Sequence, residues 1–293
     1  MKFWQATAFC ESEQLLDLAR LSEETGFDGL MVSDHLVFPE RIESKYPYTE
    51  DGDAHWTPDT DWPDPWVAIG AMSAVTQRLR FSTNVYVGPL RNPFHVAKSV
   101  GTAAHLSGNR VALGLGVGWM KEEFDLVGEE FHNRGKRLDE MIEIMRALWG
   151  GGMVEYHGEH YDFDRLAVSP TPSEPVPIWV GGQSEAALRR AARNDGWIGI
   201  LYSPDEAFEW VERVRKHVDE AGRSDADFEL LLAVYALDDV DLFRRLEDAG
   251  VTALVTAPWM LAGGGLSQKG GSTFDEKRRF VEDFAERVIA RMR

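Results

Sequence analysis

Eight short apolar runs, separated by amphipathic stretches, constrain the fold of this chain more than any other feature. The runs cover residues 3–9, 29–33, 79–87, 111–117, 178–180, 197–202, 228–236 and 253–257. They are mostly continuous rather than alternating, which is typical of parallel strands in a sheet that is covered on both faces. The sequence therefore predicts eight buried strands.

The stretches between these runs have helical patterns. One of the clearest has apolar residues at 138, 141, 142, 145, 148 and 149 and is followed by Gly150. An earlier helical stretch is followed by Gly26, which is placed to end it in a left-handed conformation. Eight strands alternating with helices favour a (β/α)8 barrel, which needs roughly 250 residues, over an open doubly wound sheet. No shift in composition marks a boundary, so residues 1–293 are predicted to form a single domain.

Two segments interrupt the alternation. Residues 39–65 form a long loop after the second strand, with five prolines and many acidic and aromatic residues. Residues 154–163 alternate around His157 and Gly158, which predicts a hairpin inserted before the fifth strand. The loops that follow the strands of a barrel build its active site. We therefore expect the long loop to lie on the functional face.

The charge balance excludes several classes of partner. Lys and Arg number 31 and Asp and Glu number 49, which gives a formal net charge of −18. Nucleic acids and anionic membranes are polyanions, so binding to either is not expected. The chain has no apolar run of about 18 residues and no apolar signal-peptide core at its N-terminus. A cytoplasmic protein is expected.

Metal and thiol chemistry is not expected either. Cys10 is the single cysteine, so the chain forms no internal disulfide, and a small buried filler is favoured over a nucleophile. His157 and His160 have the spacing H-x-x-H, but side chains three residues apart on a hairpin point to opposite faces. No metal site is predicted.

The segment Ser33-Asp34-His35 stands where the second strand should end. A histidine at the tip of a strand can exchange protons near neutral pH, and an adjacent carboxylate can set its charge. A structural hydrogen bond is the alternative role for such a histidine. Both interpretations fit the sequence.

Two glycine-rich segments could approach a ligand. Gly114, Gly116 and Gly118 alternate along the fourth strand, where they fit either a planar ligand against bare backbone or strands packed too closely for side chains. A strand, the turn 181–184 and a helix follow one another in residues 177–190. Free amides at the start of that helix suit a phosphate, and an ordinary capped turn is the alternative.

A rival phosphate site lies after the eighth strand. Residues 263–271 contain five glycines and Lys269, and many barrels bind phosphate in this position. A solvated loop is the alternative interpretation of the segment.

Taken in order, these segments resemble the bacterial-luciferase-like superfamily, and specifically its deazaflavin (coenzyme F420)-dependent oxidoreductases. The resemblance covers nearly the whole chain. It is carried by ETGFDGLMVSDH at 24–35, NV at 84–85, PLRNP at 89–93, LSGNR at 106–110, GVGW at 116–119, EEF at 122–124, RGKRLDE at 134–140 and GGQS at 181–184. The order of the set, rather than any one piece, makes it specific.

The resemblance implies a (β/α)8 barrel with the ring system of the cofactor over its mouth. It implies a cis peptide at Asn84-Val85 that supports the ring, Asp34 near the ring edge, and His35 as the proton carrier. The remaining residues expected at the cofactor are Gly116, Gly118 and Trp119, and, in the phosphate turn, Gly181, Gly182, Gln183 and Ser184.

Position 119 departs from the pattern of one subgroup. Sugar-phosphate dehydrogenases of this branch carry a glutamate acid directly after the strand-four glycines, where this chain has Trp119. With the loop aromatics at 46, 48, 56 and 62, this tryptophan suggests a more apolar substrate. Anchoring of the long loop is the alternative role for those aromatics.

The leading functional hypothesis is hydride transfer between a reduced deazaflavin and a small, fairly apolar organic substrate. The first alternative keeps the fold and uses FMN in a two-component monooxygenase; the second is a non-catalytic flavin-binding protein. The resemblance also implies a homodimer, and a two-component system would need a separate cofactor reductase. The acidic tail of F420 calls for a basic strip, for which the candidates are Arg91, Lys98, Lys121, Arg137, Arg189 and Arg190.

Overall fold

A computed structural model describes residues 1–224, 227–262 and 272–293 of the chain. Within these residues, nine parallel strands form one sheet in the order β3-β2-β1-β11-β10-β9-β8-β5-β4. The strands are β1 (Lys2–Ala6), β2 (Gly29–Val32), β3 (Arg80–Thr83), β4 (Tyr86–Val87), β5 (Leu113–Gly116), β8 (Ile178–Gly181), β9 (Gly196–Tyr202), β10 (Glu229–Val234) and β11 (Ala253–Thr256).

The sheet closes on itself through the two pieces of one predicted strand. The run 79–87 was expected as a single strand, but it breaks at Asn84-Val85 into β3 and β4. β4 pairs with β5, and β3 meets the segment before β5 through a parallel bridge between Phe81 and Val111. The amide of Ala112 donates to the carbonyl of Phe81 at 2.8 Å. The predicted (β/α)8 barrel is therefore confirmed, with its third strand in two pieces.

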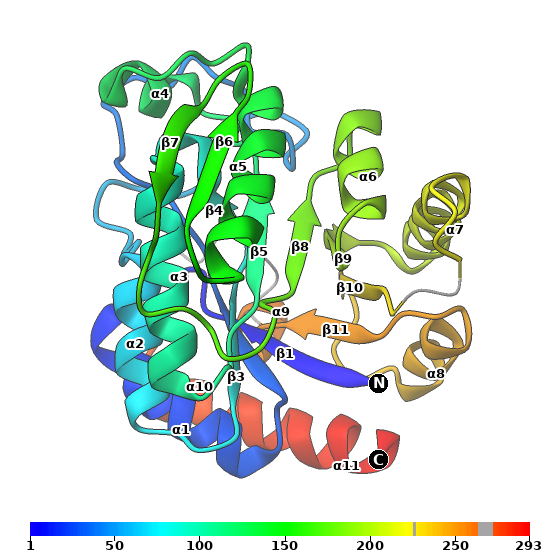
Figure 1. Cartoon of the computed structure of the whole chain (residues 1–293). Helices are drawn as coiled ribbons and strands as arrows, with labels where there is room; N and C mark the ends of the chain where they lie inside the picture. The colour runs from blue at the N-terminus through cyan, green and yellow to red at the C-terminus, as the bar shows by residue number, and fades with distance from the viewer. Residues whose placement is uncertain (225–226, 263–271) are drawn as a thin grey trace.

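Helices surround this barrel (Figure 1). They are α1 (Leu15–Thr25), α2 (Pro65–Ala74), α3 (Pro93–Ser107), α4 (Lys121–Val127), α5 (Arg134–Trp149), α6 (Glu185–Ala192), α7 (Pro204–Glu220), α8 (Val240–Asp248), α9 (Pro258–Ala262), α10 (Phe274–Phe284) and α11 (Ala290–Met292), with 3₁₀ turns at Ser12–Gln14 and Gly88–Leu90 and a π-helical segment at Ala285–Ile289. Gly26 ends α1 with φ 89°, as predicted. No helix among the described residues is long and apolar enough to cross a bilayer.

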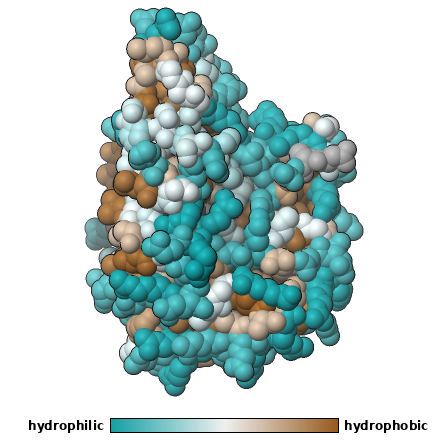
Figure 2. Space-filling view, turned by 60° about the horizontal axis from the view of Figure 1, so that its bottom comes forward, coloured by the Kyte–Doolittle hydropathy of each residue, from teal (hydrophilic) through white to brown (hydrophobic). Residues whose placement is uncertain are grey.

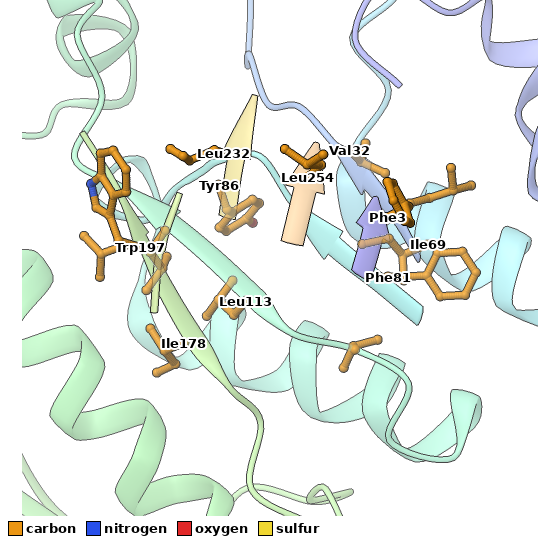
Figure 3. Close-up of a cluster of buried hydrophobic side chains, with 14 of the residues drawn as sticks. Phe3, Val32, Ile69, Phe81, Tyr86, Leu113, Ile178, Trp197, Leu232 and Leu254 are labelled. Carbon is orange, nitrogen blue, oxygen red and sulfur yellow. The ribbon is translucent and has the colours of Figure 1, made fainter. Parts of the chain in front are cut away.

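The strands are buried on both faces, which explains their continuous apolar runs. Trp4, Met31 and Trp179 belong to a cluster inside the barrel, whereas Phe3 and Phe81 pack outward against the helices. Figure 3 shows part of the outer layer, where residues of several strands pack with Ile69 of α2. The surface in Figure 2 is mostly hydrophilic, with hydrophobic residues in small separate groups.

Both predicted interruptions are present. The antiparallel strands β6 (Val154–His157) and β7 (Asp162–Leu166) form the hairpin, which α5 holds through the carboxylate of Glu140 and the amides of Glu159, His160 and Tyr161. Residues 33–64 contain no helix or strand and connect β2 to α2. This segment is called the long loop below.

Candidate active site at the barrel mouth

A pocket of about 520 Å³ opens where the strands end. Its volume is within the usual range for small-molecule and cofactor sites. All the site residues predicted from the sequence line it, namely Asp34, His35, Asn84, Val85, Gly116, Gly118, Trp119, Gly181, Gly182, Gln183 and Ser184. The fold thus brings together residues spread over 151 positions, while the role of each one stays a prediction.

One side of the pocket is the turn between β8 and α6. Ser184 begins α6, and its hydroxyl oxygen accepts a hydrogen bond from the amide of Ala187 at 3.2 Å. Gly182 has φ +113°, a conformation that side chains rarely adopt, and a Cβ there would stand 3.1 Å from the Cβ of Ala187. The Gln183 side-chain amide donates to the hydroxyl of Tyr202 at 3.0 Å. Residues 181–184 are called the glycine turn below.

The glycine turn has the features of an anion-binding site. The first amides of a helix have no acceptor within the helix, and the dipole there favours negative charge. The turn brings no side-chain charge of its own, and burial raises the pKa of Tyr202, the partner of Gln183, to about 12. These groups therefore fit a phosphate.

Val85 lies at the base of the pocket, between Gly116 of β5 and Gly181 of β8. The Asn84-Val85 peptide is cis, as the resemblance implied. The Val85 side chain fills the space where a Cβ on Gly116 or Gly181 would lie, at 2.5 and 2.7 Å respectively. The side-chain oxygen of Asn84 is buried without a hydrogen-bond partner, and the residue lines the pocket. A ligand polar group could satisfy it.

The glycines of the fourth strand are explained by packing. A Cβ on Gly114 would lie 1.9 Å from the carbonyl oxygen of Thr83, and one on Gly118 would lie 2.6 Å from Val87. With the contact of Gly116 to Val85, all three positions are too close to a neighbour for a side chain. Of the two interpretations left open by the sequence, close packing suffices, although Gly116 and Gly118 also line the pocket.

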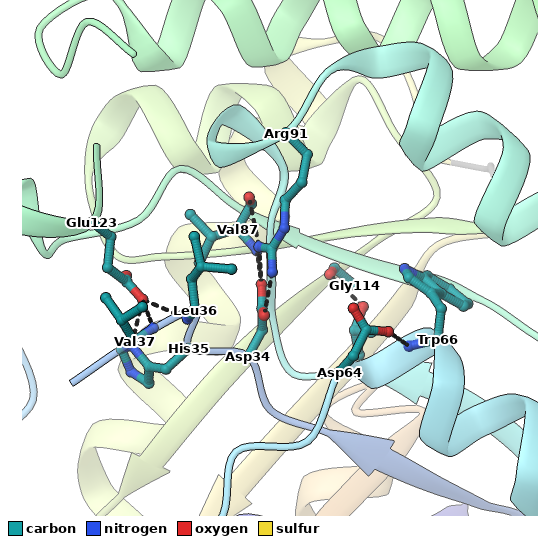
Figure 4. A network of polar contacts seen from close by, with 11 residues as sticks. Asp34, His35, Leu36, Val37, Asp64, Trp66, Val87, Arg91, Gly114 and Glu123 are labelled. Carbon is teal, nitrogen blue, oxygen red and sulfur yellow. Dashed lines mark hydrogen bonds and ion pairs between the residues drawn. The ribbon is translucent and has the colours of Figure 1, made fainter. Parts of the chain in front are cut away.

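Asp34 is held by the protein on both carboxylate oxygens. Arg91 donates one hydrogen bond to each oxygen, and the amide of Val87 donates to Oδ2 at 2.8 Å. Burial raises the pKa of Asp34, and the Arg91 guanidinium opposes this effect. Figure 4 shows Asp34 turned toward Arg91 and Val87. The aspartate therefore ties the tip of β2 to the segment after β4.

The imidazole of His35 is surrounded by three indole rings, and its Nδ1 faces the carboxylate of Glu123. Its ring centroid is 4.9 Å from that of Trp56, 5.0 Å from Trp62 and 5.9 Å from Trp119. Its Nδ1 is buried and lies 3.5 Å from Oε1 of Glu123.

The long loop supplies most of the aromatic side of the pocket. Ring contacts of 5.1–6.3 Å join its residues to one another and to neighbouring elements. The connected rings that line the pocket are Phe9, His35, Tyr46, Tyr48, Trp56, Trp62 and Trp119, and together they are called the aromatic wall. Both interpretations of the loop aromatics fit, because the same rings contact each other and border the cavity.

The proposed basic strip does not form, because most of its members have partners elsewhere. Lys98 donates to the carbonyl of Ser169, Lys121 pairs with Asp125, and Arg91 pairs with Asp34. Arg137 and Arg190 are buried against Glu129 and Asp139, and Arg189 is exposed on α6. Among the described residues, the cations on the pocket wall are instead Lys45 and Arg134, and Arg134 stacks on Phe131.

The other candidate motifs fall outside this site. Cys10 is buried, which raises its pKa to about 12, so its thiol stays protonated. His157 pairs with Asp162 across the hairpin. The described residues contain no cluster of three or more His, Cys, Asp or Glu able to hold a metal ion. The rival phosphate segment 263–271 lies outside the described residues.

The chain is thus a parallel barrel with a cofactor-sized pocket, a glycine turn and a histidine at its mouth. The family model for luciferase-like monooxygenases matches residues 10–241. The chain therefore belongs to the luciferase-like family.

Individual relatives agree with this assignment. An uncharacterized protein of Mycobacterium tuberculosis is 39% identical over 100% of both chains. An F420-dependent glucose-6-phosphate dehydrogenase of Nakamurella multipartita is 31% identical over 85% of this chain and 71% of its own length. The solved structure of a monooxygenase from Streptomyces bottropensis superposes with a TM-score of 0.75 over 100% of both chains at 18% identity. This last likeness supports the fold alone. The family thus includes F420-dependent enzymes as well as monooxygenases.

Proposed function

We propose that this protein is an F420-dependent oxidoreductase that exchanges hydride with a small, fairly apolar organic substrate. The observation that carries the proposal is that the glycine turn, Val85 and His35 line the same pocket. The pocket fits a flavin-type cofactor, because it has an anion cradle at α6 and an orphaned buried oxygen on Asn84. When bound, the deazaflavin supplies two-electron hydride chemistry.

The protein's own groups would then bind, orient and move a proton. The amides and hydroxyl of the glycine turn would hold the phosphate, and Val85 would support the ring. His35 would give a proton to the substrate atom that gains an electron pair, or remove one in the reverse direction. The aromatic wall would exclude water from the reacting atoms.

The aromatic wall supports an apolar substrate rather than a sugar phosphate. The relative from Nakamurella multipartita is named for glucose 6-phosphate. In this chain, Trp119 stands where such enzymes carry a glutamate, and its ring lies 5.1 Å from Tyr46 and 6.1 Å from Trp56. The only pocket-wall cations among the described residues, Lys45 and Arg134, are partly engaged, with Lys45 Nζ 3.2 Å from Asp53.

A second candidate function is FMN-dependent monooxygenation. It is favoured by the family model, which is described for monooxygenases. The glycine turn would hold the FMN phosphate in the same way. We also propose a cytoplasmic location and a homodimeric state; sedimentation of the purified protein would test the homodimer.

Titration of the apoprotein with F420 and with FMN tests the proposal first. The chain has ten tryptophans, so quenching of intrinsic fluorescence reports binding. We expect F420 to bind with a Kd of about 1 μM or tighter, followed by reoxidation of reduced F420 with an apolar carbonyl or alkene acceptor. Tight binding of FMN alone would support the monooxygenase instead. Binding of neither cofactor would refute both functions.

A further inference from the structure

Two consecutive glutamates in the first turn of α4 hold the long loop. Oε1 of Glu122 accepts hydrogen bonds from the amides of Glu43 at 2.6 Å and Ser44 at 3.0 Å. Oε1 of Glu123 accepts in the same way from Leu36 at 2.6 Å and Val37 at 3.4 Å. The two side chains therefore perform the same task for the loop at two separate points.

Only Glu123 also faces His35. Its Oε1 is 3.5 Å from Nδ1 of the imidazole, and the Glu123 side chain is 1% exposed. Nδ1 is buried and has no hydrogen bond within the described residues. Figure 4 shows the carboxylate of Glu123 directed toward His35, Leu36 and Val37 together.

Other charged groups near the histidine are already paired. Asp34, its neighbour in sequence, is bound by Arg91 and by the amide of Val87. The remaining faces of the ring are covered by the indoles of Trp56, Trp62 and Trp119, which carry no charge. Within the described part of the chain, Glu123 is the single carboxylate within ion-pair distance of the imidazole.

We propose that Glu123 is the positioning residue for His35, an inference that rests on the proposed function. A separation of 3.5 Å is longer than a formed N–H···O bond, and such bonds at active sites often shorten when ligands fill the site. The Nδ1–H of His35 donates to Glu123, so that Nδ1 keeps its hydrogen and Nε2 is the nitrogen that gives or takes the proton.

The pair Glu123→Gln and Glu122→Gln separates this role from loop anchoring. Each substitution removes one charge and keeps an oxygen that can accept from the loop amides. Loss of the positioning carboxylate should lower kcat by at least about tenfold, because partners that orient a histidine typically contribute this much. The KM values should stay within about twofold, since no substrate contact changes. Glu122→Gln should leave kcat within about twofold. Equal effects of the two variants would overturn the proposal.

A spectroscopic readout tests the pairing without turnover. ¹⁵N-labelled histidine would be incorporated and the His35 signals assigned by their absence in His35→Gln. At alkaline pH, we expect wild-type His35 to carry its hydrogen on Nδ1, and this preference to weaken in Glu123→Gln but not in Glu122→Gln. Hydrogen on Nε2 in the wild type, or no difference between the variants, would refute the positioning role. If F420 turnover is absent while the tautomer result holds, the proposed function fails and the pairing of His35 with Glu123 stands.

Discussion

The two sides of the pocket are built by different means. The glycine turn is short and rigid, because it joins β8 directly to α6 and is fixed by a capping hydroxyl and by Gly182 at φ +113°. The aromatic wall comes mainly from residues 33–64, which have no regular secondary structure and depend on ring contacts and on two glutamates of α4. The comparison indicates that the proposed cofactor side depends on backbone geometry, whereas the proposed reaction side depends on side-chain contacts.

The largest expected effect is on the reaction side. His35→Ala should lower kcat by at least about 100-fold, because it removes the proton carrier. The Kd of the cofactor should stay within about threefold, since the glycine turn is untouched. Steady-state kinetics and fluorescence titration measure both quantities. His132→Ala, an exposed histidine away from the pocket, is the control. Weakened binding with unchanged turnover per bound cofactor would sink the proton-carrier role.

Gly182→Asp perturbs the other side. A carboxylate beside the proposed phosphate, at a backbone conformation unsuited to side chains, should weaken cofactor affinity by more than about tenfold, or about 1.4 kcal/mol. Gly222→Asp introduces the same charge at φ +70° away from the pocket and controls for backbone strain. An unchanged Kd in Gly182→Asp would place the phosphate elsewhere, with 263–271 as the next segment to mutate.

Trp56→Leu should have a smaller effect than the first two substitutions. It should also show whether the aromatic wall contacts the substrate or the cofactor. Trp56 contacts His35, Tyr46 and Trp62, so its loss removes part of the substrate surface. We expect KM for an apolar substrate to rise by up to about tenfold, with the Kd of the cofactor unchanged. If both constants changed equally, the aromatic wall would belong to the cofactor site.

The smallest effect concerns ionic strength. The acidic tail of F420 should interact with the exposed Lys45 and the half-buried Arg134, and salt screens such interactions, most strongly at the exposed lysine. Raising salt from about 0.05 to about 0.5 M should weaken F420 binding a few-fold and FMN binding less. Calorimetric titration at both concentrations measures the difference. Equal salt dependence of the two ligands would argue against a tail site on these cations.

Local patterns predicted most of the fold, because a strand buried on both faces is mostly apolar. They did not predict the break of the third strand, since residues suited to a strand stand on both sides of Asn84, at 81–83 and 85–87. The hairpin and the long loop were recognisable from alternation and prolines. The cis peptide at Asn84-Val85 came from the resemblance, as nothing in the residue types requires it.

The sequence predicted which residues line the site better than it predicted which side chains contact one another. Residues at strand ends converge in any barrel, so Asp34, His35 and the glycine turn could be placed together. Glu123 was missed, because acidic residues in the first turn of a helix are ordinary partners of its dipole. Only the fold shows that this carboxylate lies against a residue 88 positions earlier. The basic strip failed for the same reason, since the partners of Arg91 and Arg190 are distant in sequence.

The crowding of indoles in the aromatic wall has an optical consequence. The Trp56 ring is 5.5 Å from Trp62 and 6.1 Å from Trp119, and the planes are steeply inclined at 67° and 88°. Chromophores this close and inclined couple their electronic transitions and give paired bands of opposite sign in circular dichroism. Displacement of the long loop by a substrate would change those bands. The protein therefore carries an unlabelled reporter of the position of its long loop.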